Sequence, residues 1–176
     1  SFIYSADHIL GNAQCDNPSM FYYLMNFSGR IWSAGEVPLW NPYVMMGLPF
    51  VGEGQGAVFH PAQLFFALLD TAVAYNLVVY LCFIFSALAF YSYLRAMGLS
   101  RWSSVFGALV WNFSSAMISR IHAGHLTNIL LFPMLPLMLL LCEKWRNHQN
   151  SIFLFAATAI AYGVMVLGAH PQFLFI

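Results

Sequence analysis

Four long apolar stretches without any Asp, Glu, Lys or Arg restrict how this chain can fold more than any other feature. They cover residues 71–94, 102–119, 126–142 and 151–169. A helix needs about 20 mainly apolar residues to cross the hydrocarbon core of a bilayer, and each stretch reaches or approaches that length. The sequence therefore predicts an all-α integral membrane protein, a polytopic helix bundle. A kink is expected where Pro133 and Pro136 interrupt the third span.

Composition excludes other classes of protein. The 176 residues are 61% hydrophobic and only 7% charged, whereas soluble globular domains are about 25% charged. Six basic and six acidic residues cancel, so no basic field exists to attract nucleic acid. Intrinsic disorder requires low hydrophobicity and high net charge, the reverse of this pattern.

The cations predict which side of the membrane each loop occupies, because Lys and Arg concentrate in cytoplasmic loops. Arg95 and Arg101 flank the turn after the first span, and two more cations, Lys144 and Arg146, follow the third. Arg30 and Arg120 are the only cations on the opposite side. Residues 1–70 are thus expected to form an extracytoplasmic loop, and residues 71–176 the transmembrane region.

That topology requires a helix before Ser1 to carry the chain across the membrane. The sequence also starts without Met and stops within the apolar run 173–176. We therefore expect the chain to be a fragment of a longer protein.

The first 70 residues carry their own helical signals. Asn17 and Pro18 are a typical helix start and Gly35 a typical stop. Between them, apolar or small residues recur at steps of three and four, which predicts an amphipathic helix along the membrane surface; they are Phe21, Leu24, Met25, Ser28, Ile31 and Trp32. A second short helix is expected from His60 or Pro61 to Asp70. The Pro and Gly residues between the two helices predict an ordered loop without long helix or strand.

Several short motifs together resemble the bacterial YfhO-type polytopic membrane proteins, which are similar to the GT-C class of glycosyltransferases. They are Gly35 to Tyr43, Gly47-Leu48-Pro49, Gln55 with Phe59-His60-Pro61, the turn from Tyr93 to Ser100, and Gly168-Ala169-His170-Pro171-Gln172. The family tends to have Tyr where this chain has His60.

The resemblance implies a GT-C-type bundle with a partly helical first extracytoplasmic loop. It also implies a bacterial inner-membrane enzyme that takes a sugar from a polyprenyl-phosphate carrier on the outer side. The acceptor would be a lipid, a wall polymer or a protein. Membrane lipids and the donor are the expected partners, and an acidic residue of the first outer loop is expected at the reaction centre.

Asp16 is the leading candidate for that acid. Transfer to a hydroxyl requires a carboxylate within hydrogen-bond reach of the acceptor oxygen, which takes its proton as the new bond forms. Asp7 is the competing candidate. The structural alternative for Asp16 is a favourable interaction with the positive end of the helix that starts at Pro18.

The leaving phosphate needs a cation or a metal, because negative charge grows on it as the bond breaks. Arg120 is a candidate clamp, since guanidinium binds phosphate bidentately; otherwise it extends to the outer interface. Further candidates for substrate binding share the expected outer face; they are His122, His125, His60, Glu53, His170 and Gln172. The pair His122 and His125, joined by a histidine or carboxylate of this group or by Asp16, is also a possible divalent-metal site. For His170 to Gln172 the alternative is a simple helix stop.

Two other functions stay open. One is a non-catalytic transporter or lipid-binding membrane protein, although transporters tend to place ionisable groups near the bilayer midplane, and the four spans contain no Asp, Glu, Lys or Arg. The other is a structural assembly subunit.

Overall fold

The computed structural model describes residues 20–147 and 151–168, and these residues are mostly helical. The helices are α1 (Tyr22–Ser33), α2 (Gln63–Leu68), α3 (Thr71–Ala96), α4 (Arg101–Asn112), α5 (Ser115–Ala123), α6 (Leu126–Leu131), α7 (Met134–Asn147) and α8 (Ile152–Gly168). Two short strands, β1 (Trp40–Asn41) and β2 (Leu48–Pro49), and the 3-10 helix η3 (Val51–Glu53) lie between α1 and α2.

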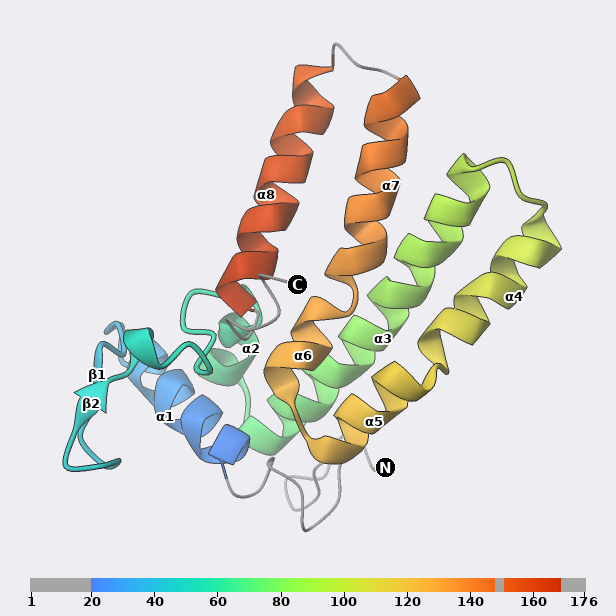
Figure 1. Cartoon of the computed structure of the whole chain (residues 1–176). Coiled ribbons are helices and arrows are strands. Elements are labelled where there is room, and N and C mark those ends of the chain that lie inside the picture. Colours follow the sequence, from blue (N-terminus) through green and yellow to red (C-terminus); the bar gives the residue numbers. More distant parts are fainter. Residues whose placement is uncertain (1–19, 148–150, 169–176) are drawn as a thin grey trace.

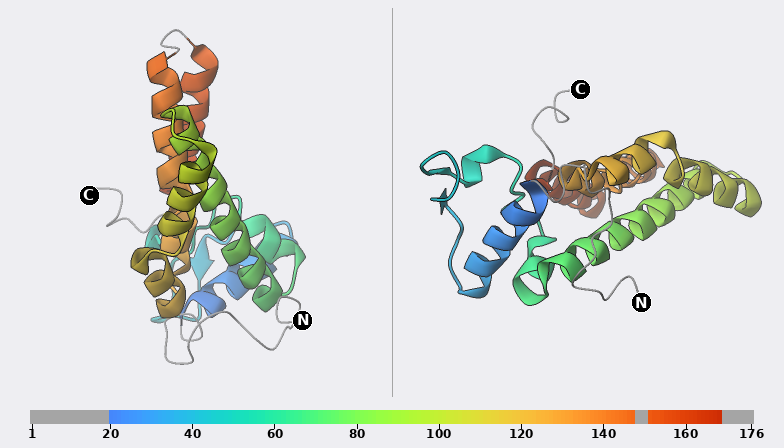
Figure 2. Two further views of the ribbon diagram at one scale, coloured as in Figure 1. Left: turned by 90° about the vertical axis from the view of Figure 1, so that its right-hand side faces the viewer. Right: turned by 90° about the horizontal axis from the view of Figure 1, so that it is seen from below.

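The long helices form two antiparallel pairs, α3 with α4 and α7 with α8, and α3 packs on α7 (Figure 1). The segment that holds α1, α2 and the hairpin lies at one end of these pairs, beside the start of α3 and the end of α8 (Figures 1 and 2). The turn between α5 and α6 lies at the same end. We call this the loop end of the bundle; the ends of α3 and α7 form the far end.

Within the described residues, two helical segments are long and apolar enough to cross a membrane. They are Thr71–Ala96, with a mean hydropathy of 2.1, and Leu126–Asn147, with 1.8. The helix Ile152–Gly168 is apolar but shorter. Helices Thr71–Ala96 and Ile152–Gly168 agree closely with the predicted stretches 71–94 and 151–169. That Ile152–Gly168 crosses the membrane stays a prediction.

The second predicted stretch, 102–119, is not one continuous helix. It is divided between α4 and α5 by a break at Phe113 and Ser114, where Ser114 takes an extended conformation (ψ 151°). Serine and asparagine favour helix ends because their side chains compete for backbone hydrogen bonds. The prediction of a loop over 120–125 was also wrong in part, since α5 continues to Ala123.

The third predicted stretch, 126–142, has the expected interruption at its first proline. Helix α6 ends at Leu131 and α7 starts at Met134, because Pro133 has no N–H to continue the ladder. Pro136 lies in the first turn of α7, where proline is tolerated. Helix α7 then extends to Asn147, so Lys144 and Arg146 belong to its last turn rather than to a loop.

The segment from residue 20 to residue 70 contains two helices and an irregular loop between them, as expected, but the second helix covers Gln63–Leu68 instead of the predicted range from His60 or Pro61 to Asp70. Helix α1 ends before Gly35, which takes the left-handed conformation (φ 79°) that favours glycine. The strands β1 and β2 pair in an antiparallel hairpin, with Trp40 opposite Pro49. The predicted start of the first helix, at Asn17 and Pro18, lies outside the described residues.

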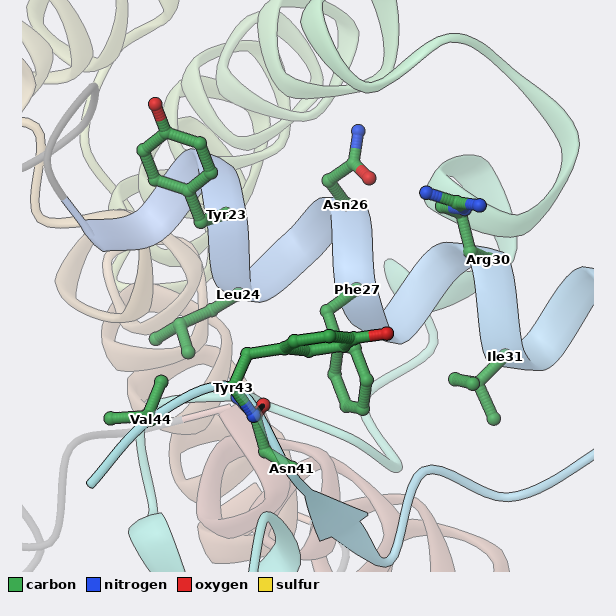
Figure 3. A pocket seen from close by; sticks show the side chains of 9 residues that line it. All are labelled: Tyr23, Leu24, Asn26, Phe27, Arg30, Ile31, Asn41, Tyr43 and Val44. Atoms are coloured by element: carbon green, nitrogen blue, oxygen red, sulfur yellow. Dashed lines mark hydrogen bonds between the residues drawn. The ribbon is translucent and has the colours of Figure 1, made fainter. Parts of the chain in front are cut away.

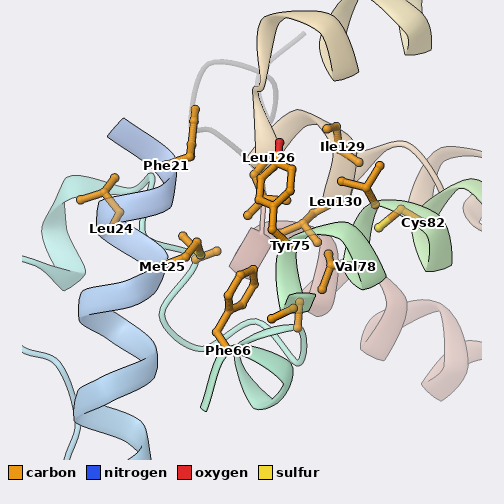
Figure 4. Close-up of a cluster of buried hydrophobic side chains, with 14 of the residues drawn as sticks. Phe21, Leu24, Met25, Phe66, Tyr75, Val78, Cys82, Leu126, Ile129 and Leu130 are labelled. Carbon is orange, nitrogen blue, oxygen red and sulfur yellow. The ribbon is translucent and has the colours of Figure 1, made fainter. Parts of the chain in front are cut away.

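A single apolar core joins the loop end to the bundle (Figure 4). Side chains of α1, α2, α3 and α6 meet there; the labelled ones are Phe21, Leu24, Met25, Phe66, Tyr75, Val78, Cys82, Leu126, Ile129 and Leu130. Four of the six predicted face positions of the first helix are buried, namely Phe21, Leu24, Met25 and Ser28. The segment 20–70 is therefore packed on the bundle and is not a loose loop.

Polar side chains link α3 to α4 within the bundle. The Trp111 indole N–H donates to the Ser86 hydroxyl (2.8 Å), and the Asn112 amide donates to the Phe83 carbonyl (2.7 Å). Trp111 also stacks on Phe90, with ring centroids 4.9 Å apart. These contacts stabilise the antiparallel pair, because lipid tails offer no hydrogen-bond partners to the polar groups involved.

Candidate functional site

The turn between α5 and α6 holds three of the predicted site residues. Arg120, half-buried, and His122, exposed, lie in the last turn of α5, and His125 directly precedes α6. The His125 ring lies 6.2 Å from the Phe21 ring, and its Nδ1 is 3.2 Å from the Asn128 amide nitrogen. These contacts fix the imidazole of His125 against the start of α1.

His60 is buried at the opposite side of the loop segment, just before α2. Its Nδ1 accepts a hydrogen bond from the Ala62 N–H (3.1 Å), so the ring proton belongs on Nε2. This Nε2 is buried and has no hydrogen-bond partner in the described part of the chain. Burial lowers the pKa of His60 to about 4, so the imidazole is neutral at pH 7.

The end of α8 approaches His60 closely because its last residue is glycine. A Cβ atom on Gly168 would lie 2.6 Å from Cδ2 of His60 and 3.0 Å from Nε2. Any larger residue would therefore displace the imidazole or the helix end. This contact joins the last described helix to the loop segment.

Gln63, the first residue of α2, is a buried polar partner that the sequence analysis did not select. Its amide nitrogen donates to the Gly56 carbonyl (2.7 Å) and lies 3.4 Å from the sulfur of Met25. Its Oε1 is buried without a partner among the described residues. A glutamine within an otherwise apolar short helix was the available signal.

A cavity of about 470 Å³ lies beside these two residues; we call it the His60 cavity. Trp32 and Phe59 form an aromatic wall, with ring centroids 6.4 Å apart, and the Trp32 N–H donates to the Val58 carbonyl. The described lining residues are Trp32, Ser33, Val58, Phe59, His60, Pro61, Gln63, Leu64, Ala67 and Leu68. None of them carries a charge at pH 7, because His60, the one titratable side chain in this list, is neutral there; the cavity therefore suits a neutral ligand.

A second cavity, of about 360 Å³, runs along α1 and faces the hairpin (Figure 3); we call it the α1 groove. Tyr23, Asn26 and Arg30 project from one side of α1, and Asn41, Tyr43 and Val44 approach from the hairpin on the other. Leu24, Phe27 and Ile31 complete its lining. Sequence reasoning used Arg30 only for topology, because nothing in its local motif indicated a cavity.

Glu53 ends the 3-10 helix η3 and is half-buried. Burial raises the pKa of its carboxyl group, and its Oε2 has no hydrogen-bond partner among the described residues. The Oε2 atom of Glu53 therefore forms no hydrogen bond with His60 or His125.

The predicted substrate-binding residues do not form one cluster. His125 contacts Phe21 at the start of α1, whereas His60 shares a cavity with Trp32 near its end. Those two helix positions are separated by about 16 Å at 1.5 Å per residue. Within residues 20–147 and 151–168, no group of three His, Cys, Asp or Glu is placed to hold a metal ion. The predicted residues Asp7, Asp16, His170 and Gln172 lie outside the described residues.

Residues 59–175 match the family model described as "6-pyruvoyl-tetrahydropterin synthase related domain; membrane protein". The chain belongs to this family of membrane proteins. No curated protein and no solved structure has detectable similarity to the chain. The family description supports the membrane part of the resemblance, whereas the likeness to YfhO-type proteins and GT-C enzymes stays a prediction.

Proposed function

We propose that this protein is a membrane glycosyltransferase that moves a sugar from a polyprenyl-phosphate carrier to an extracytoplasmic acceptor. In this proposal the bundle is part of a larger GT-C-type fold in a bacterial inner membrane, and the loop end faces outward. Three observations support it: the membrane family, the position of the described candidates His60 and His125 at the loop end of the bundle, and the motifs that resemble YfhO-type proteins.

The observation that carries the proposal is the His60 cavity. It combines an aromatic wall, a neutral imidazole N–H and an amide oxygen, without any charged group among its described lining residues. A sugar hydroxyl both accepts and donates hydrogen bonds, and the apolar face of a sugar ring packs well on aromatic rings. Both polar atoms are covered in the structure, so the proposal requires His60 and Gln63 to turn toward the cavity before a hydroxyl can bond to them.

Asp16 would act as the base that takes the proton of the acceptor hydroxyl, with Asp7 as the competing candidate. Arg120 would stabilise the leaving phosphate, with His125 and His122 beside it. Because His125 and His60 lie near opposite ends of α1, the His60 cavity would then hold the acceptor rather than the transferred sugar. A divalent ion could take part in this role. The acceptor in this proposal is a lipid, a wall polymer or a protein.

The test uses the full-length protein in membranes supplied with labelled polyprenyl-phosphate sugars. Native protein, Asp16→Asn and Asp7→Asn are compared at matched expression, and transfer of the label is measured. We expect Asp16→Asn alone to abolish transfer. Normal transfer by Asp16→Asn would contradict the role of this residue, and no consumption of any donor by the native protein would contradict the transferase itself.

A second comparison tests the cavity. Gly168→Leu displaces the His60 imidazole or the end of α8, whereas Gly163→Leu changes the same helix at a position with no neighbour within 4 Å of the added Cβ atom. We expect only Gly168→Leu to reduce donor consumption. Equal donor consumption by the two variants would show that the His60 cavity takes no part in the reaction.

A further inference from the structure

We propose that the α1 groove binds the phosphate group of an anionic membrane lipid. This inference does not depend on sugar transfer, because the groove and the His60 cavity are lined by different residues. It rests on the hydrogen-bond donors of the groove, on its charge, and on the apolar surface that continues from it.

The donors come from both sides of the groove. Arg30 offers an exposed guanidinium that forms no ion pair within the described residues. The Tyr43 hydroxyl points along α1 toward the Arg30 end (Figure 3). Asn41 is only 3% exposed, and its Oδ1 accepts the Tyr43 backbone N–H (3.0 Å). That bond identifies the amide oxygen of Asn41 and leaves its NH₂ group as a further donor in the groove lining.

The charge of the groove selects an anion. Arg30 is its only cation among the described lining residues, and none of those residues is acidic. A guanidinium binds phosphate through two parallel N–H bonds, which are shorter and stronger than bonds between neutral groups. Water solvates this exposed guanidinium, but only an anion forms such charge-assisted bonds with it, so phosphate is a better occupant than a neutral ligand.

The surroundings of the groove select a lipid rather than free phosphate. Its wall continues through Val44 into the tip of the hairpin, where Met45 and Met46 are 88% and 103% exposed. Trp40 and Tyr43, which flank the tip, are also exposed, at 56% and 83%. Exposed apolar patches rimmed by polar groups mark interaction surfaces, and Trp and Tyr favour the membrane interface. A lipid places its chains on this apolar surface and its phosphate at Arg30.

The test measures lipid retention by the full-length protein in neutral detergent, with native mass spectrometry as the readout. Short-chain phosphatidylglycerol, phosphatidylcholine of the same chain length and inorganic phosphate are titrated separately. We expect saturable binding of phosphatidylglycerol, weaker binding of phosphatidylcholine, and still weaker binding of inorganic phosphate. Equal binding of the two lipids would overturn the anion site, and phosphate binding as tight as that of phosphatidylglycerol would overturn the lipid assignment.

Two sets of variants locate the site. Arg30→Gln should weaken phosphatidylglycerol binding by about tenfold, the loss expected for one charge-assisted contact, whereas Arg101→Gln at the far end should not. Met45→Asn with Met46→Asn should weaken lipid binding without changing that of inorganic phosphate. Asparagine is chosen because both positions have positive φ, which it tolerates. An equal effect of Arg30→Gln and Arg101→Gln would refute the location; donor consumption, measured separately, reports on the transferase.

Discussion

Gly29 lies where α1 and α2 cross at the shortest separation. A Cβ atom at this position would overlap the Phe66 carbonyl of α2, whereas a Cβ on Gly163 in α8 would meet nothing within 4 Å. We expect Gly29→Ala to lower the thermal unfolding midpoint because backbone atoms cannot move aside. Gly163→Ala should keep or raise the midpoint, since alanine favours a helix by about 1 kcal/mol. Thermal unfolding in detergent measures both, and equal midpoints would contradict the close crossing.

His60 predicts a dependence of stability on pH. Burial lowers its pKa in the folded protein from 6.5 to about 4, so between these values the unfolded chain binds the proton and the folded one does not. Stability should therefore fall as the pH decreases from about 6.5, by up to about 3 kcal/mol near pH 4. Glu53 contributes in the opposite direction, because its pKa is raised.

The matched variants isolate this effect. His60→Asn keeps an acceptor for the Ala62 N–H but does not titrate, so its unfolding midpoint should fall less on acidification than that of the native protein. His122→Asn, at an exposed position, should behave like the native protein. If His60→Asn loses as much stability on acidification as the native protein, the histidine is not responsible.

At the scale of elements, the pair of α3 and α4 depends on the bond from Trp111 to Ser86. Ser86→Ala leaves the part-buried indole N–H of Trp111 without its acceptor and should destabilise the protein by about 1 kcal/mol. Ser92→Ala is the control, because its hydroxyl bonds to the Leu88 carbonyl of its own helix. The free energy of unfolding in detergent should be lower for Ser86→Ala than for Ser92→Ala. A larger decrease for Ser92→Ala would contradict a stabilising bond between the helices.

Helix positions could be predicted from the sequence more reliably than helix breaks. Hydropathy located α3 and α8 to within about two residues at each end because long apolar runs have few alternatives. The break at Phe113 and Ser114 lies within an apolar stretch, so hydropathy does not report it, although Asn112 and Ser114 favour helix ends. The interruption at Pro133 was predictable because proline acts through its own backbone.

At the scale of the whole molecule, the four cations that predict sidedness gather at the far end of the bundle. Arg95 is in the last turn of α3, Arg101 starts α4, and Lys144 and Arg146 end α7. Met46→Cys, at the loop end, should therefore react with a membrane-impermeant maleimide in intact cells. Met97→Cys, also exposed, should react only after permeabilisation. Labelling of Met97→Cys in intact cells would reverse the predicted orientation.

The candidate site was predicted only in part. The sequence analysis selected His60 and His125 as residues of one outer face, and both lie at the loop end. It could not show that they occupy opposite ends of α1, nor that Gln63 and Arg30 line cavities, because these placements depend on how α1, α2 and the hairpin pack. The separation shows that His60 and His125 do not belong to one cluster in the described part of the chain.

The hydrogen bonds between α3 and α4 have a consequence for biogenesis. A nascent chain meets the bilayer one segment at a time, and Asn112 in α4 would enter lipid with its amide unpaired if α4 were inserted alone. Its acceptor, the Phe83 carbonyl, belongs to the helix made just before it. We therefore expect α3 to wait beside the insertion channel until α4 emerges, and the two to be released into the membrane together.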